Sequence, residues 1–320
     1  NIFFLIFSNN AFASTVMSLL VFLAPSSIFC ICCSCSAISS LTISLSSLNE
    51  LLIEINDEFT TWEEQPYGKI SIYNNDYWFI NSFKGMVDRM PYTYQTDKGM
   101  QFVKKYIPKY KNIIEVGAHC GIQTLFYKQQ ISPKCKYYAI EPQSKIYKLL
   151  RHNIDQNGLD IKTYCAAGFC FTGHLKMNDT IEPVDSHLYE RPPKFELISE
   201  LEQNKRMLNY GGVCIGNGGE KVKCYKLDDM GFDNIGFIHS DAQGAEPYLF
   251  YGARKLIKKN RPVIYYENIE LYGKYLYNIV QKEYPEYEKQ SKFNIKNYCM
   301  NDLKYSKYID VNSFDTLLIP

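Results

Sequence analysis

A short stretch with two glycines, IIEVGAHCGIQTLFY at residues 113–127, has the residue types and spacing of a ligand-binding turn. An apolar run that contains Glu115 ends at Gly117, and a helical pattern begins after Gly121. Glycine permits both a sharp turn and a close approach of the backbone to a ligand. A dinucleotide site would need the spacing G-x-G-x-x-G, whereas His119 stands where its second glycine would be. The turn is therefore a poor match for NAD or FAD.

A second carboxylate, Glu141, follows Gly121 by twenty residues and ends the apolar stretch KYYAIEP. A carboxylate at the end of such a strand can accept hydrogen bonds from both hydroxyls of a ribose. Together the two segments predict a site for S-adenosylmethionine, an adenosine cofactor without a pyrophosphate, although ordinary strand-end carboxylates remain an alternative. The residues that we expect to bind this cofactor are Glu115, Gly117, Ala118, His119, Gly121, Glu141, Pro142, Ala166 and Asp241.

A third segment, residues 235–268, places Asp241 at the end of one expected strand and Glu267 at the end of the next. Open α/β sheets carry their chemistry at the carboxyl ends of their strands. A hydroxyl nucleophile gains from a general base, so Asp241 is the first candidate for a catalytic base and Glu267 is the second. Strand alternation puts Asp241 on the same side as His239, beside the sulfonium end of the cofactor. Asp241 could instead cap the following helix, and Glu267 could be a structural hydrogen-bond acceptor.

This third segment, with LDDM just before it, resembles the FkbM-type methyltransferases. The residues that match the pattern of that family are Leu227, Asp228, Asp229, Asp241, Gly244, Ala245, Glu246, Gly252, Ala253, Pro262 and Glu267. The resemblance covers about residues 112–270 and departs at His239, where lysine is usual, and at Gln243, where glutamate is usual. It implies a class I methyltransferase fold, S-adenosylmethionine as the methyl donor, and O-methylation, often of sugar or other small-molecule hydroxyls. The departure at Gln243 puts in doubt any role that needs a charge there.

The elements that must position these residues alternate between strand and helix patterns. We expect strands at 112–116, 136–140, 161–166, 235–240 and 262–267, and helices at 97–106, 122–130, 144–156 and 245–258. This order predicts an α/β fold with a doubly wound, mostly parallel, Rossmann-like sheet. An N-terminal hairpin is expected at 68–83, and a long insertion, 172–226, precedes the fourth strand. Inside the insertion we expect a helical stretch around 195–208 and a second hairpin that turns at Asn217 and Gly218.

Composition divides the chain into residues 1–49, 50–110 and 111–320. The first part has no Asp, Glu, Lys or Arg, so all 35 basic and 34 acidic residues lie in the other two. Its apolar stretch 16–33 leaves three interpretations open: a membrane anchor, a targeting signal, and an artefact of gene-start assignment. The second part holds the expected hairpin and short helix, and the third is the expected methyltransferase domain.

Net charge and cysteine usage limit which partners and which cellular location we expect. A net charge of +1 gives no long-range field, so we expect no nucleic-acid partner, and membrane contact only if residues 1–49 are a real anchor. Seven of the eleven cysteines are scattered singly, and this odd-numbered, dispersed set favours reduced thiols and a cytoplasmic location for the folded domain. The cluster at 30–35 lacks a second ligand pair, so no metal is predicted.

Two classes of function stay open. The first is an enzyme with a small-molecule hydroxyl acceptor, carbohydrate being one candidate. The second is a binding or interaction protein on a methyltransferase scaffold, for which Gln243 is the motivating departure. For the enzyme we expect Tyr and Phe side chains of the hairpin and the insertion to cover the pocket above Asp241 and to exclude water.

Overall fold

The structure is a computed structural model that describes residues 98–181, 196–203, 210–268 and 270–320, together with six strands before residue 80. The chain divides into two compact units, Asn1–Pro66 and Tyr67–Pro320. The first contains a four-stranded antiparallel sheet in the order β1-β2-β3-β4. These strands are β1 Phe4–Leu5, β2 Leu19–Ala24, β3 Ser27–Cys32 and β4 Leu41–Ile43. The strands described in this unit do not test the anchor, signal and gene-start interpretations of residues 1–49, so these stay open.

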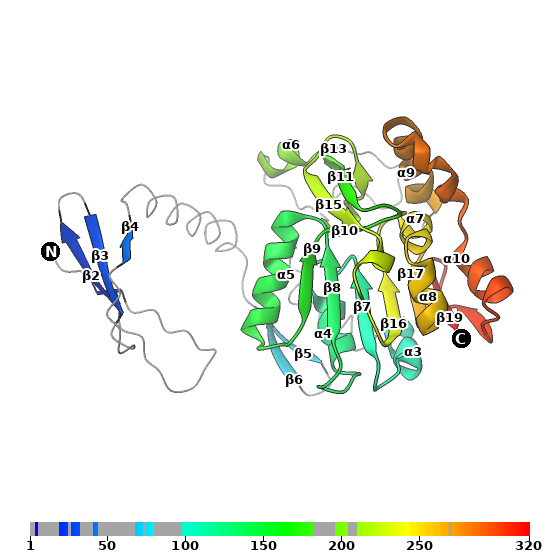
Figure 1. Ribbon diagram of the computed structural model, residues 1–320, viewed down its shortest axis with the longest axis horizontal. Helices are drawn as coiled ribbons and strands as arrows, with labels where there is room; N and C mark the ends of the chain where they lie inside the picture. The colour runs from blue at the N-terminus through cyan, green and yellow to red at the C-terminus, as the bar shows by residue number, and fades with distance from the viewer. Residues whose placement is uncertain are drawn as a thin grey trace. The chain divides into compact units, whose positions relative to one another are not determined.

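The second unit is built on a seven-stranded sheet in the order β18-β19-β17-β16-β7-β8-β9 (Figure 1). Its strands are β7 Asn112–Val116, β8 Tyr137–Glu141, β9 Lys162–Cys165, β16 Ile235–Ser240, β17 Val263–Glu267, β18 Lys307–Asp310 and β19 Asp315–Ile319. Neighbours from β17 to β9 pair in parallel, and β19 pairs antiparallel with both β17 and β18. This sheet confirms the predicted doubly wound, mostly parallel α/β fold.

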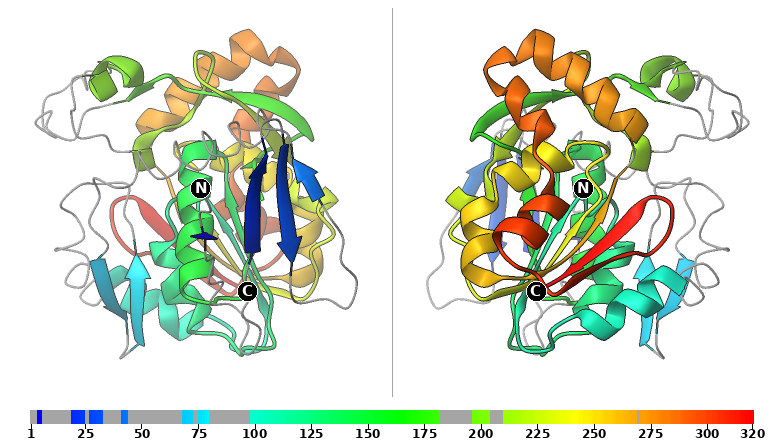
Figure 2. Two further views of the ribbon diagram at one scale, coloured as in Figure 1. Left: turned by 90° about the vertical axis from the view of Figure 1, so that its left-hand side faces the viewer. Right: turned by 90° about the vertical axis from the view of Figure 1, so that its right-hand side faces the viewer.

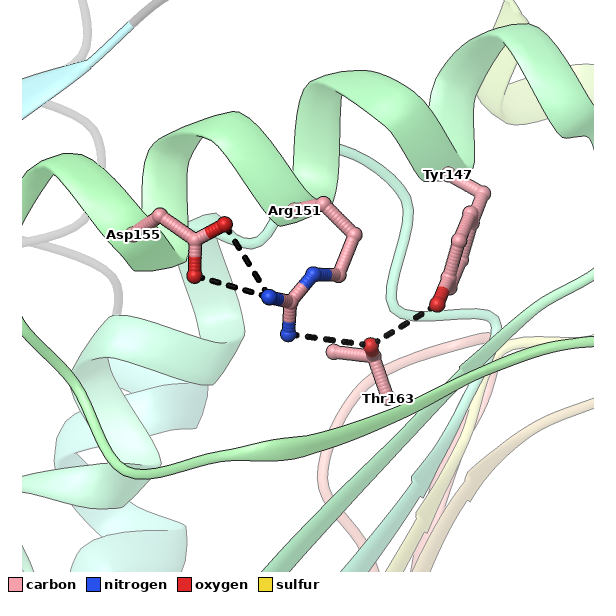
Figure 3. Close-up of polar contacts among 4 residues, drawn as sticks. All are labelled: Tyr147, Arg151, Asp155 and Thr163. Atoms are coloured by element: carbon pink, nitrogen blue, oxygen red, sulfur yellow. Dashed lines mark hydrogen bonds and ion pairs between the residues drawn. The ribbon is translucent and has the colours of Figure 1, made fainter. Parts of the chain in front are cut away.

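Helices cover both sides of the sheet (Figure 2). The helix α4, Ile122–Lys128, follows β7, and α5, Ser144–Gln156, follows β8. The apolar stripe of α5 is buried as its periodicity predicted: Ile146, Leu149, Leu150 and Ile154. Polar contacts also hold α5 to β9, since the hydroxyls of Tyr147 and Thr163 lie 3.0 Å apart and Arg151 donates to Oγ1 of Thr163 at 3.4 Å (Figure 3). Within α5, Arg151 also binds Asp155 at 2.9 Å.

The helix expected at 245–258 is two helices, α7 Glu246–Tyr251 and α8 Arg254–Asn260. A Cβ on Gly252 between them would overlap the carbonyl oxygen of Phe169. The carbonyl of Gly252 accepts a bond from the backbone N–H of Asp228 at 3.0 Å. The carboxylate of Asp228 then caps α8, because it accepts from the backbone N–H groups of Leu256 at 2.8 Å and Lys255 at 3.2 Å. The prediction of one continuous helix was wrong, because these distant contacts break it.

The insertion, together with β10 just before it, forms a second small sheet in the order β10-β15-β11-β14. Its strands are β10 Ala167–Gly168, β11 Gly173–Met177, β14 Ile215–Gly216 and β15 Lys221–Tyr225. Both β14 and β15 pair antiparallel with β11, one on each side, so the hairpin predicted at Asn217 and Gly218 is wrong. A Cβ on Gly218 would overlap the carboxylate of Asp179, which shows how closely the connection crosses the end of β11. Beyond this sheet, β12 Thr180–Ile181 pairs with β13 Glu196–Leu197, and α6 spans Ile198–Gln203, within the expected helical stretch.

The N-terminal hairpin is present, since β5 Gly68–Ile72 pairs antiparallel with β6 Asn75–Phe79. Figures 1 and 2 show it at the end of the sheet opposite to the insertion. The expected short helix is α3, Lys98–Val103, continued by a 3-10 turn at Lys104–Tyr106. After β17 the chain forms α9 Glu270–Glu283, a 3-10 segment Pro285–Lys292 and α10 Ile295–Asn297. No helix in the described part of the chain has the length and apolarity that crossing a bilayer would require.

Candidate active site

A pocket opens at the carboxyl ends of β7, β8 and β16, beneath the sheet of the insertion. Its empty space is about 1040 Å³, open solvent at its mouth included. Seven of the predicted site residues line it: Glu115, Gly117, Ala118, His119, Glu141, Pro142 and Asp241. The other three, Gly121, Ala166 and Glu267, lie outside its lining. The structure therefore brings most of the predicted site together at the expected edge of the sheet.

The two glycines of the turn are needed for different packing contacts. Gly117 has a φ of +80°, and a Cβ there would overlap the carbonyl oxygen of Asp241 at the end of the neighbouring strand. Gly121 has a φ of +96°, and its Cβ would lie 2.8 Å from a methyl carbon of Leu150 on α5. The space that the sequence assigned to a ligand at Gly121 is therefore filled by a side chain of the core. Of these two glycines, only Gly117 lines the pocket.

Glu141 is positioned at the end of β8 by backbone donors. Its Oε2 accepts from the N–H of His119 and its Oε1 from the N–H of Gln143, both at 2.9 Å. Burial raises the pKa of this carboxyl to about 7, although the two backbone bonds act in the opposite direction. Each carboxylate oxygen can accept more than one hydrogen bond, and Glu141 lines the pocket. The predicted contact with ribose hydroxyls therefore fits this geometry.

Glu115 connects elements of the sheet as well as lining the pocket. Its Oε2 accepts from the hydroxyls of Thr124 on α4 and Tyr137 on β8. Its Oε1 lies 3.6 Å from Nδ1 of His239, and neither atom has a hydrogen-bond partner within the described residues. The bonds made by Oε2 favour the alternative of a structural carboxylate over a direct contact with the cofactor.

His119 is a turn residue with a neutral ring. Its φ is +49°, and its Nδ1 lies 3.2 Å from the sulfur of Cys120. Burial lowers the pKa of the imidazole to about 4, and the nearby carboxylate of Asp241 only partly opposes this shift. An imidazole with this pKa is uncharged at neutral pH, so its ring can border a ligand without adding charge.

The two candidate catalytic carboxyls are joined by Gln243. Its side-chain nitrogen donates to Oδ1 of Asp241 at 2.6 Å and to Oε2 of Glu267 at 3.0 Å. Burial raises the pKa of Glu267, and the adjacent Asp241 raises it further. Gln243 and Asp241 line the pocket, so Glu267 reaches it only through its neighbours.

The insertion supplies one wall of the pocket, which the sequence indicated only in outline. Its described contributors are small or aliphatic, not the Tyr and Phe side chains that we expected: Met177, Gly211, Val213, Cys214 and Ile215. The carbonyl of Tyr210 accepts from the side chain of Gln143 at 2.9 Å, beside Glu141, and fixes the insertion to the start of α5. The N-terminal hairpin lies at the other end of the sheet, so its predicted place over the pocket is wrong.

Within the described residues, no three His, Cys, Asp or Glu side chains gather in a way that could hold a metal ion. The seven cysteines of the unit Tyr67–Pro320 are all free thiols, and six of them are buried.

Among the solved structures that match this chain are three methyltransferases with low sequence identity to it. A methyltransferase FkbM from Methylobacillus flagellatus KT is 12% identical with a TM-score of 0.38, over 84% of this chain and 60% of that chain. The O-methyltransferase TomG from Streptomyces achromogenes, solved with S-adenosylmethionine, is 13% identical with a TM-score of 0.35, over 71% of this chain and 79% of that chain. An O-methyltransferase from Bacillus cereus, solved with S-adenosylhomocysteine, is 15% identical with a TM-score of 0.37, over 87% and 92%. This chain thus spans less than two thirds of the Methylobacillus protein, and no curated protein matches it.

This chain also matches a known family of protein domains. Residues 115–306, more than half of the 320-residue chain, match the family described as Methyltransferase FkbM domain. This match confirms the resemblance seen in the sequence and, with it, the class I methyltransferase fold and S-adenosylmethionine as the cofactor. The chain belongs to the FkbM family of methyltransferases.

Proposed function

We propose that this methyltransferase transfers its methyl group to a hydroxyl oxygen of a small molecule, with carbohydrates as the first class of acceptor to test. The observation that carries the proposal is the position of Asp241. Asp241 lines the same pocket as Glu141, the expected ribose contact. It follows β16, Glu141 ends β8, and only β7 lies between these two strands in the sheet. A general base is useful for a hydroxyl nucleophile, which must lose a proton as it is methylated.

The residues of the pocket have separable roles in this proposal. The bound cofactor supplies a methyl group on a positively charged sulfur. Glu141 binds the ribose, and Asp241 accepts the proton of the acceptor hydroxyl. Alignment of the two reacting groups supplies much of the rate, and the apolar wall formed by Val213 and Ile215 keeps water away from them.

Methyl transfer to a panel of monosaccharides and other hydroxyl compounds, followed by mass spectrometry, tests the proposal. We expect Asp241→Asn to lower kcat by about 10²- to 10⁴-fold, the usual contribution of a general base. Binding of S-adenosylhomocysteine should stay within a few-fold of the parent. Asp302→Asn changes an exposed carboxylate and serves as the control. An Asp241→Asn variant as active as the parent would exclude Asp241 as the base.

A non-catalytic binding protein is the second candidate, because Gln243 replaces a glutamate that is usual in the family. Calorimetry separates the two candidates, since a scaffold without affinity for S-adenosylmethionine cannot be the enzyme. The Glu141→Ala variant is the negative control for that titration.

A further inference from the structure

Gln243 lies in a turn whose backbone is fixed by its surroundings. Its φ is +49°, an uncommon value for a residue with a side chain, and Gly244 follows with a φ of +89°. A Cβ on Gly244 would lie 2.5 Å from the carbonyl carbon of Tyr272 on α9. The turn is therefore packed directly against the backbone of α9. Uncommon backbone conformations of this kind persist where the surrounding structure enforces them, and they gather at functional sites.

The side chain of Gln243 links the ends of two adjacent parallel strands. Its amide nitrogen carries two hydrogens, and it donates to Asp241 after β16 at 2.6 Å and to Glu267 of β17 at 3.0 Å. The two carboxyls are half-buried and share one amide donor, and such close carboxyls favour a state in which only one of them is ionised. A carboxylate at position 243 could not donate these bonds unless it were itself protonated.

The two carboxyls differ in their surroundings. Asp241 lines the pocket, whereas Glu267 lies outside its lining, and the shorter bond from the amide goes to Asp241. A hydrogen bond to an ionised acceptor is shorter and stronger than one to a neutral acceptor. Other charged or titratable groups that act on the pair come from four elements: His119, Glu141, Glu246 and Asp315. Three of these four are acids, so the surroundings favour retention of one proton by the pair.

We propose that Gln243 is a positioning residue that orders a proton-sharing pair, in which Asp241 carries the charge toward the pocket and Glu267 keeps the proton. The inference extends the proposed function, since Asp241 is the base of that reaction. During transfer the acceptor oxygen forms a bond to the methyl carbon, the carbon–sulfur bond breaks with its electrons left on sulfur, and the hydroxyl proton passes to Asp241. Ordering by Gln243 holds the carboxylate of Asp241 at the pocket, where it can accept that proton.

Infrared spectroscopy of the free protein tests the protonation state without any activity. At pH 8.5 the parent should show the stretching band of a protonated carboxyl, and Glu267→Gln should remove it. Two buried carboxyls, Glu141 and Glu246, have pKa values raised to about 7, so they are mostly ionised at that pH. An unchanged band in Glu267→Gln would overturn the proposal.

Substitution of the amide tests the ordering. Gln243→Gly removes both donors but suits the positive φ, so the fold should be retained. We expect the acid limb of its kcat/KM profile to move upward by about one pH unit, and kcat/KM at pH 6.5 to fall about tenfold. Affinity for S-adenosylhomocysteine should stay within threefold. Asn234→Gly is the matched control, because Asn234 also has a φ of +49° but lies before β16, away from the carboxyls.

The outcomes separate this inference from the proposed function. If the parent methylates no hydroxyl compound, the proposed function fails, and the infrared titration of parent, Glu267→Gln and Gln243→Gly still decides the inference. If Gln243→Gly has the carboxyl titration of the parent, the ordering role is refuted. An active parent together with a shifted carboxyl titration in Gln243→Gly would support both.

Discussion

Replacement of Glu141 by alanine should weaken cofactor binding by about 10- to 150-fold. The carboxylate lines the pocket and is fixed at 2.9 Å by the backbone N–H groups of His119 and Gln143, so it is already oriented for a ligand. A hydrogen bond to a charged group contributes about 1.5–3 kcal/mol, and each 1.4 kcal/mol is a factor of ten in affinity. Alanine also leaves both backbone donors without their acceptor, so the loss should lie toward the upper end of this range.

The same carboxyl predicts a pH dependence with a defined sign. Burial raises the pKa of Glu141 to about 7 in the folded protein, above the value of 4.5 for an exposed carboxyl. Between these values the folded state holds a proton that the unfolded state has lost, so the contribution of Glu141 to stability decreases as the pH rises from about 4.5 to 7. Ribose hydroxyls bind the ionised form better. Affinity should therefore fall by up to about tenfold for each pH unit below 7, and be constant above 8.

Calorimetry with S-adenosylhomocysteine at pH 6, 7.5 and 8.5 measures both effects. The control is Glu246→Gln, because burial also raises the pKa of Glu246 to about 7 but this residue does not line the pocket. Its Oε1 accepts from the N–H of Ala242 at 2.7 Å, and glutamine can keep that bond. Equal affinity in Glu141→Ala and the parent would remove Glu141 from the cofactor site. An equal loss of affinity in Glu141→Ala and Glu246→Gln would show that the loss comes from lower stability of the fold and not from a missing contact with the cofactor.

Two substitutions test the packing that shapes the site, and thermal unfolding measures both. Gly117→Ala should destabilise the domain well beyond the roughly 1–2 kcal/mol cost of a left-handed alanine, because its Cβ would overlap the Asp241 carbonyl oxygen. Gly158→Ala is the control, because Gly158 has a φ of +59° and no atom lies within 4 Å of its added Cβ, so it should lose only the cost of the left-handed backbone. Equal losses of stability in the two variants would contradict the overlap at Gly117. Asp228→Ala removes the cap of α8 and should cost about 1 kcal/mol, or roughly 2–4 °C in Tm. An unchanged Tm would show that water replaces the cap.

Strands and single helices could be predicted closely because their signals are local. Strands buried on both faces of a parallel sheet are continuous apolar runs, and β7 and β16 have the predicted bounds. The helix α5 also spans the predicted residues, since its buried stripe has a clear helical period. No strand was predicted beyond β17, so β18 and β19, the antiparallel edge of the sheet, were missed.

Contacts between distant segments account for the wrong predictions. The break between α7 and α8 depends on Phe169 and Asp228, which lie far from Gly252 in the sequence. The pairing of β14 with β11 depends on which of several short strands is adjacent in space. The turn residues Asn217 and Gly218 alone favour a local hairpin, so the sequence could not reveal that β14 pairs with β11 instead.

The site shows the same difference between local signals and distant contacts. The spacing of its residues identifies where the chain must turn, but not which side chain fills the space beside the turn. Gly121 has the spacing of a ligand contact, yet its missing Cβ makes room for Leu150. Conversely, Gln243 is a departure from the family pattern that suggested lost function when read alone. The sheet places β16 beside β17, and the amide then lies between Asp241 and Glu267. In that position a neutral amide can donate to both carboxyls, whereas an ionised glutamate would add a negative charge beside two acids that already lie close together. The departure therefore argues for a functional carboxyl pair more strongly than against it.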